Sequence, residues 1–226
     1  MLILGIDTSG KSGGVTLAEA GNSEFRALAS AAIEGGTFSA QLVPTVAALL
    51  NKTRLGIRDV DGLAAVSGPG SFTGLRVGLS AVKGLAEVLH KPIATVSLLE
   101  ALAASSQENG KIIAALDAGR SEVFYGLYEM ENGNLACLNE QLLSGDDFAE
   151  QATKPGIALT LTSDPALAEK LAAGGLQAHL TERPDSGLIA QIGARKLMAG
   201  KTVSVEALDA NYLRRSDAEI FFKGSR

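Results

Sequence analysis

The sequence has 226 residues, a formal net charge of −5 and a hydrophobic content of 46%. This composition is typical of a folded protein with a sizeable core, and it argues against a disordered chain or a generally basic nucleic-acid binder. The single cysteine cannot form an internal disulfide, and the sequence has neither a signal-peptide pattern nor about 18 consecutive apolar residues for a membrane span. We therefore expect a cytoplasmic protein that does not enter a membrane.

The first half of the chain predicts an α/β unit. Apolar and β-branched residues between turn residues predict strands at 2–6, 15–20, 25–32, 60–66 and 92–96. Apolar residues at helical spacing predict helices over 39–52, 73–89 and 97–106. Pro44 lies inside the first of these helices, so we expect this helix to start late or to kink.

A strand, an aspartate, a turn and a second strand occur twice. M-L-I-L-G-I-D ends at Asp7 and K-I-I-A-A-L-D ends at Asp117, 110 residues later, so the two aspartates take the same place in the two copies. Further strands are predicted at 134–142, 157–162 and 177–180, and further helices at 164–173 and 186–198. We predict a duplicated α/β fold with an N-terminal lobe (1–102), a C-terminal lobe (103–204) and a final segment (205–226) that returns to the first lobe.

Two such hairpins resemble those of the actin-like, hexokinase and Hsp70 superfamily, in which they hold nucleotide phosphates and Mg²⁺ in a shared cleft. The resemblance implies a nucleotide cleft at Asp7, Thr8, Ser9 and Asp117. It also implies an alternative function, a stand-alone actin-like ATPase or phosphotransferase. The other interpretation is that each aspartate only caps its turn through Asx hydrogen bonds.

The stretch S-G-P-G-S-F-T-G-L-R-V-G (67–78) follows a predicted strand and opens a predicted helix, as a phosphate-binding loop would. The P-loop spacing fails because Gly70 and Gly74 are one residue too close and the first lysine is Lys83. The dinucleotide pattern fails because Thr73 occupies the place of its third glycine. An anion site made only of backbone amides at the helix start stays open as an alternative.

The sequence predicts no catalytic residue and no metal ligand. His90 and His179 are the only histidines, and they lie far apart without the spacing of metal ligands. Cys137 has no neighbouring histidine, and its apolar context predicts a buried side chain.

The helix predicted over 73–89 carries more apolar and small residues than one buried face requires. Leu75, Leu79 and Val82 form the face expected to cover its own lobe, and a second set lies beside them. The combined arc covers about half of the helix, whereas a surface helix needs an arc of about 100°. The helix is therefore either packed between its sheet and a neighbouring helix or part of a protein–protein interface. The second set consists of Gly74, Val77, Gly78, Ala81, Gly84, Leu85 and Val88.

Residues 67–86 resemble the signature of the TsaB (YeaZ) family of bacterial tRNA-modification proteins. M-L-I-L-G-I-D-T-S at the N-terminus, L-D-A-G-R-S-E-V-F-Y-G-L-Y (116–128) and Y-L-R-R (212–215) resemble other parts of the family's sequence. The resemblance implies duplicated RNase H-like lobes of the actin-like (ASKHA) superfamily. It implies a non-catalytic subunit needed for N6-threonylcarbamoyladenosine at position 37 of tRNAs that read ANN codons. The paralogous TsaD transfers the threonylcarbamoyl group with a metal held by an H-x-x-x-H motif, which this sequence lacks, and TsaE is a third component.

The resemblance also implies a partner surface. Family members contact TsaD through the first two helices of the N-terminal lobe and pair with themselves through the same surface when isolated. Here those helices are 39–52 and 73–89, and the first contributes Phe38, Gln41, Leu42 and Thr45. Phe38 replaces a polar residue of the family's pattern and Ala40 an acidic one, which makes this edge more apolar.

The remaining implications concern ligands. The resemblance implies no firmly bound cofactor, only a weak adenine nucleotide with Mg²⁺ at the interface of the complex. It also implies that the chain meets tRNA only as part of the complex with TsaD. Arg76, Arg214 and Arg215 are the candidate residues for contact with tRNA.

Overall fold

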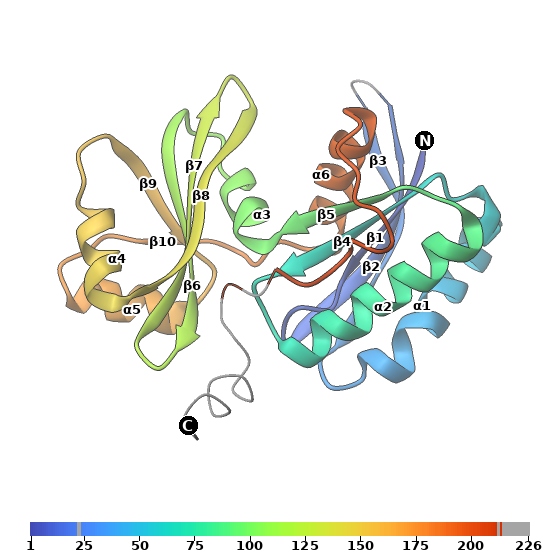
Figure 1. Ribbon diagram of the computed structural model, residues 1–226, viewed down its shortest axis with the longest axis horizontal. Helices are drawn as coiled ribbons and strands as arrows, with labels where there is room; N and C mark the ends of the chain where they lie inside the picture. The colour runs from blue at the N-terminus through green and yellow to red at the C-terminus, as the bar shows by residue number, and fades with distance from the viewer. Residues whose placement is uncertain (22–23, 212, 214–226) are drawn as a thin grey trace. The chain divides into compact units, whose positions relative to one another are not determined.

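The computed structural model of the chain describes residues 1–21, 24–211 and 213, which form two compact α/β units (Figure 1). The first unit is built from Met1–Leu98 and Pro184–Asn211, and the second is built around Leu99–Arg183. Within these described ranges, no helix is both long enough and apolar enough to span a bilayer.

One five-stranded sheet forms the centre of the first unit. Its strands are Leu2–Asp7 (β1), Ser12–Ala20 (β2), Phe25–Glu34 (β3), Gly62–Gly68 (β4) and Ile93–Ser97 (β5). Their order is β3-β2-β1-β4-β5; β2 is antiparallel to both β1 and β3, and β4 and β5 are parallel to β1. β1 and β4 are buried along their whole length, as their continuous apolar runs favour.

Helices cover both faces of this sheet. Phe38–Thr53 (α1) and Phe72–Leu89 (α2) lie together on one face, and Ser186–Met198 (α6) covers the other (Figure 1). α6 approaches the sheet closely, because a Cβ on Gly193 would lie only 2.2 Å from the Cβ of Ala64. α1 begins at Phe38 and continues through Pro44, so it does not start late. A short 3₁₀ helix (η1, Ile57–Asp59) precedes β4.

The second unit repeats this architecture. Its strands are Gly110–Gly119 (β6), Glu122–Glu131 (β7), Asn134–Ser144 (β8), Ile157–Thr162 (β9) and His179–Leu180 (β10). Read from its β8 edge, the sheet has the order β8-β7-β6-β9-β10, with the same strand directions as the first sheet. This repetition confirms the predicted duplication and the RNase H-like, actin-like fold class.

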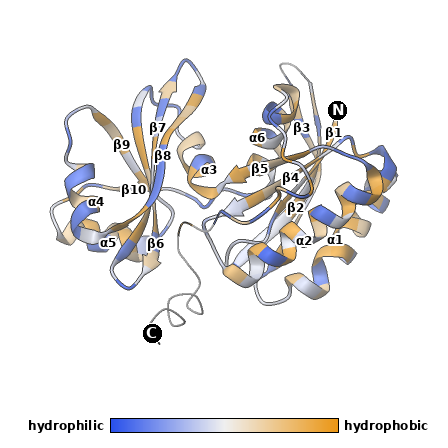
Figure 2. Ribbon diagram, in the orientation of Figure 1, coloured by the Kyte–Doolittle hydropathy of each residue, from blue (hydrophilic) through white to orange (hydrophobic). Residues whose placement is uncertain are grey.

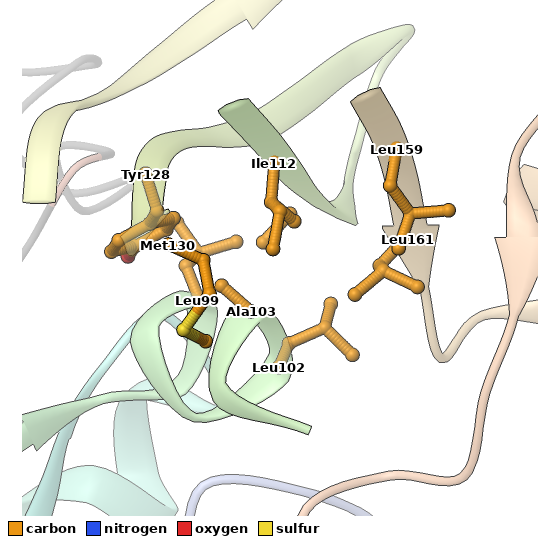
Figure 3. Close-up of a cluster of buried hydrophobic side chains, with 9 residues drawn as sticks. Leu99, Leu102, Ala103, Ile112, Tyr128, Met130, Leu159 and Leu161 are labelled. Atoms are coloured by element: carbon orange, nitrogen blue, oxygen red, sulfur yellow. The ribbon is translucent and has the colours of Figure 1, made fainter. Parts of the chain in front are cut away.

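Helices Gly145–Ala152 (α4) and Pro165–Ala173 (α5) cover one face of the second sheet. The short helix Leu98–Ala104 (α3) covers the other. Figure 3 shows Leu99, Leu102 and Ala103 of α3 directed at apolar side chains of the strands. Those side chains belong to Ile112, Tyr128, Met130, Leu159 and Leu161.

The helix that follows the last strand of each sheet belongs to the unit of the other sheet. α3 follows β5 of the first sheet but packs on the second, and α6 follows β10 of the second sheet but packs on the first. The expected lobe boundaries therefore differ from the observed units. Residues 184–204, expected in the C-terminal lobe, belong to the first unit.

The segment that follows α6 stays with the first unit as far as Asn211. Val203 N–H donates to the Ile93 carbonyl at 2.9 Å, and Asn211 N–H donates to the Ser67 carbonyl at 2.7 Å. Leu213 packs against the α3 face of the second sheet. The rest of the predicted return, residue 212 and residues 214–226, lies outside the described residues.

Candidate functional site

The start of α2 carries the glycine-rich stretch, and three amides there, those of Ser71, Gly74 and Leu75, donate to protein oxygens. Ser71 is the N-cap: its hydroxyl accepts from Gly74 N–H at 3.3 Å, and its carbonyl accepts from Leu75 N–H at 2.8 Å. The N–H of Ser71 itself donates to the Ser9 carbonyl at 2.7 Å. An anion at this helix start would therefore compete with the Ser71 hydroxyl for the Gly74 N–H and with the Ser9 carbonyl for the Ser71 N–H.

The turn between β1 and β2 packs against three glycines of the stretch. A Cβ on Gly70 would lie 2.4 Å from the Ser9 carbonyl oxygen, and one on Gly74 would lie 2.0 Å from the Thr8 carbonyl oxygen. A Cβ on Gly78 would lie 2.3 Å from Thr8 Oγ1. We call Gly70, Gly74 and Gly78 the glycine socket. The prediction that Gly74 and Gly78 face a partner protein is wrong, because both are buried against the chain's own first hairpin.

The turn that fills the socket is held by its own hydrogen bonds. Asp7, Thr8 and Ser9 are each at most 3% exposed. Asp7 Oδ1 accepts from the N–H and the hydroxyl of Ser9, at 2.8 and 2.5 Å. Thr8 Oγ1 donates to the Gly74 carbonyl at 2.8 Å. This arrangement agrees with the interpretation that Asp7 caps its turn through Asx hydrogen bonds.

Asp117 is not the structural counterpart of Asp7. In β1, Ile3 and Gly5 face α6, so Asp7 follows them on the same side. In β6, the residues that face the corresponding helix α3 are Ile112, Ala114 and Leu116. Asp117 lies on the opposite face of its strand and is exposed, so it is not the equivalent of Asp7. The second hairpin thus does not repeat the aspartate on which the ATPase alternative depends.

The outer side of α1 and α2 exposes apolar residues of both helices. On α1, Ala40, Val43 and Ala47 are exposed, and Val43 keeps 68% of its surface accessible. On α2, Val88 is 78% exposed, and Ala81 is half-buried. We call the outward-facing residues of both helices the helix-pair surface; Figure 2 shows hydrophobic residues along both helices.

A groove of about 490 Å³ opens between the N-terminal halves of the two helices. Arg76 lies over the ring of Phe72, with its guanidinium carbon 3.8 Å from the ring centre. Among the described residues, no acidic side chain lines the groove. Its lining residues are Phe38, Ser39, Leu42, Val43, Phe72, Thr73, Arg76, Val77, Ser80 and Ala81.

The predicted interface residues take different places at this surface. Gln41, Gly84 and Val88 are exposed, while Thr45, Val77, Ala81 and Leu85 are half-buried. Phe38 and Leu42 are buried but reach the groove, and Phe38 also packs on the first hairpin, where a Cβ on Gly13 would lie 3.0 Å from its ring. Sequence reasoning missed Val43 and Phe72. Val43 could have been found as an apolar residue outside the buried face of α1, which Leu42, Val46 and Leu49 form.

The remaining candidates do not assemble into a site. No three His, Cys, Asp or Glu side chains converge as a metal site within the described ranges. His90 ends α2 in a left-handed conformation (φ 53°), and His179 lies in β10. Cys137 is exposed on β8, so its predicted burial is wrong. Arg214 and Arg215 lie outside the described residues.

Comparison with known proteins relates most of the chain to one pair of paralogues. The family model described as "TsaD: tRNA N6-adenosine threonylcarbamoyltransferase" matches residues 35–216. The chain is 30% identical to the tRNA threonylcarbamoyladenosine biosynthesis protein TsaB of Bacillus subtilis (strain 168), over 80% of this chain and 81% of that protein. It is also 30% identical to the TsaB protein of Escherichia coli (strain K12), over 79% of this chain and 81% of that protein.

The solved structures agree with these relatives. YeaZ from Pseudomonas aeruginosa superposes with a TM-score of 0.75 at 26% identity, covering 93% of this chain and 100% of that one. The signature stretch, the duplicated fold and the curated relatives therefore lead to one assignment. The chain belongs to the TsaB (YeaZ) family.

Proposed function

We propose that this chain is the non-catalytic subunit that binds TsaD through the helix-pair surface. In this proposal, the complex is the N6-L-threonylcarbamoyladenine synthase that modifies adenosine 37 of ANN-decoding tRNAs. The observation that carries the proposal is the apolar surface of α1 and α2, which no described residue of its own unit covers. Burying exposed apolar side chains such as Val43 and Val88 would contribute about 25 cal/mol for each Å² removed from water.

The charge of the two helices suits a partner with acidic groups. α1 contains Lys52 and no acidic residue, and α2 contains Arg76, Lys83 and one acid, Glu87. The two helices therefore carry a formal charge of +2 (three basic residues minus one acidic residue), in a chain whose net charge is −5. Complementary charge would speed association and align the partners more than it would add affinity.

The chemistry belongs to the partner in this proposal. The match to the transferase family model indicates shared ancestry with TsaD, while the chain's two histidines cannot form an H-x-x-x-H motif because they are 89 positions apart (179 minus 90). We further propose that TsaE joins the complex, that tRNA is bound through it, and that the isolated chain pairs with itself through the same surface. An adenine nucleotide with Mg²⁺ would bind only weakly, at the interface of the complex.

The test is binding to TsaD, measured by size-exclusion chromatography with light scattering on the chain alone and mixed with TsaD. Ala81→Arg places a long charged side chain in the groove and should abolish the complex. The matched control is Ala172→Arg on α5, the counterpart of α2 in the second unit, where the alanine is exposed. An Ala81→Arg variant that still forms the complex, with stability like that of the control, would refute the proposed surface.

A further inference from the structure

We propose that Thr8, at the tip of the first hairpin, is a positioning residue that sets where α2 lies and thereby shapes the groove between α1 and α2. This inference rests on the proposed function, because the groove matters only if a partner enters it. Thr8 itself is 3% exposed, so a partner cannot contact it directly.

The contact between Thr8 and α2 is unusually close on two successive turns of the helix. The Thr8 hydroxyl donates to the Gly74 carbonyl at 2.8 Å. The Thr8 carbonyl oxygen and hydroxyl occupy the spaces where Cβ atoms of Gly74 and Gly78 would stand, at 2.0 and 2.3 Å. Because neither glycine has a side chain that could adjust, any movement of the turn must move the backbone of α2.

The same two turns of the helix carry the groove on their other side. Thr73, Arg76, Val77 and Ser80 line it, and they alternate in sequence with the socket glycines. A helix moves as a stiff rod over such a short length, so a shift at Gly74 and Gly78 is transmitted to all of these side chains. Recognition depends on shape complementarity like that of a protein interior, which a displacement of a few tenths of an ångström would disturb.

The turn between β1 and β2 can hold α2 in place because hydrogen bonds fix the turn itself. Asp7 bonds both the N–H and the hydroxyl of Ser9, and the Ser9 carbonyl accepts from Ser71 N–H at the start of α2. Thr8 is thus fixed between a closed turn and the helix it positions.

The second unit supplies an internal comparison. Its corresponding hairpin closes through Arg120 and Ser121, both with positive φ, and its tip bonds to α4, where Gly145 N–H donates to the Ser121 carbonyl at 2.9 Å. The helix that corresponds to α2 is α5, which contains no glycine and is capped by the Asp164 side chain. The close packing of a hairpin tip against helix glycines is therefore found on α2, which lines the apolar groove, and not on its counterpart α5.

The test compares three variants that are close to isosteric. Thr8→Val replaces the hydroxyl by a methyl, which cannot lie 2.8 Å from the Gly74 carbonyl; a carbon–oxygen contact needs about 3.3 Å, so α2 must move by about 0.5 Å. Thr8→Ser keeps the hydroxyl. Thr16→Val is the matched control, since Thr16 is fully buried and bonds Ser30 and Ser186 on the α6 side of the same sheet.

We expect Thr8→Val to weaken TsaD binding by about tenfold in calorimetry, a loss of about 1.4 kcal/mol. Thr8→Ser should restore affinity to within about twofold, and Thr16→Val should lower the urea midpoint without changing affinity. In the free chain, amide hydrogen exchange in α2 should become faster in Thr8→Val and stay unchanged in Thr16→Val.

Two results would overturn the inference alone: wild-type TsaD affinity in Thr8→Val, or affinity losses in Thr8→Val and Thr16→Val that simply follow their losses of stability. A wild-type chain that does not bind TsaD at all would overturn the proposed function, and this inference with it.

Discussion

Replacing Gly74 by alanine is the most direct test of the glycine socket. The added methyl would lie 2.0 Å from the Thr8 carbonyl oxygen, whereas carbon and oxygen approach to about 3.3 Å in ordinary close contacts. The backbone must therefore open by about 1.3 Å, and overpacking of this kind costs about 1–3 kcal/mol. Loss of the bond from the Thr8 hydroxyl costs about 1 kcal/mol more, and the higher helix propensity of alanine offsets about 1 kcal/mol. We expect the free energy of unfolding to fall by about 2 kcal/mol.

Gly84 provides the matched control in the same helix. It is exposed, and a Cβ added there would meet nothing within 4 Å. Only the difference in helix propensity between glycine and alanine remains, so Gly84→Ala should raise the free energy of unfolding by about 0.5–1 kcal/mol. The same substitution, ten positions apart, thus has opposite effects on stability.

Urea unfolding followed by far-UV circular dichroism measures both variants, because the chain has no tryptophan to report by fluorescence. With a slope of about 2 kcal/mol per molar urea, Gly74→Ala should unfold at about 1 M less urea than the wild type, and Gly84→Ala at slightly more. If Gly74→Ala were as stable as the wild type, or Gly84→Ala as unstable as Gly74→Ala, the socket would not exist as described.

Three further predictions follow from buried polar groups. Asp7→Ala should lower the free energy of unfolding by about 1–3 kcal/mol, because it removes the carboxylate that accepts from the buried N–H and hydroxyl of Ser9. Asp117→Ala should change it by no more than about 0.5 kcal/mol. Equal losses of stability in urea unfolding would contradict the different places of the two aspartates in the fold. Tyr128→Phe removes the hydrogen bond that the phenol donates to Glu140 and should cost about 1 kcal/mol in the same measurement; an unchanged midpoint would show that the bond contributes nothing. Burial raises the pKa of the Tyr125 phenol above its ordinary value of 10.0, so its contribution to stability is complete below pH 10 and is lost as the pH rises through the folded-state pKa. Tyr125→Phe should reduce the loss of stability at alkaline pH. An identical loss in the variant would contradict the claim that the Tyr125 phenol causes it.

The sequence predicted the secondary structure well because the pattern of apolar residues is a local property. Each predicted strand and helix has a counterpart in the fold, and the order of strands in the two sheets confirms the duplication. The exchange of α3 and α6 between the units could not be predicted. Both helices are apolar on one side, and periodicity shows that a side is buried without showing which sheet buries it.

The two errors at the candidate site have physical causes. The repeat was aligned on identical letters, Asp7 and Asp117, but the two hairpins differ in length: Gly14 pairs with Asp7 across a six-residue turn (residues 8–13), whereas residues 120–121 form the second turn. A one-residue slip in a strand exchanges the two faces, and periodicity cannot detect it. Gly74 and Gly78 were assigned to a partner because a helical projection shows small residues on one side without showing what packs there.

The duplicated fold itself provides a comparison for the helix-pair surface. α4 and α5 occupy in the second unit the places that α1 and α2 occupy in the first, so the fold alone would demand similar outer faces. α4 instead carries Asp146, Asp147 and Glu150, and α5 carries Glu169 and Lys170, which is the usual composition of a solvated face. α1 carries no acidic residue and exposes Val43 and several alanines at the corresponding place. Because the architecture is the same and the chemistry of the outer face is not, the fold of the unit does not by itself require the apolar character of α1 and α2, and this difference supports the proposed partner surface.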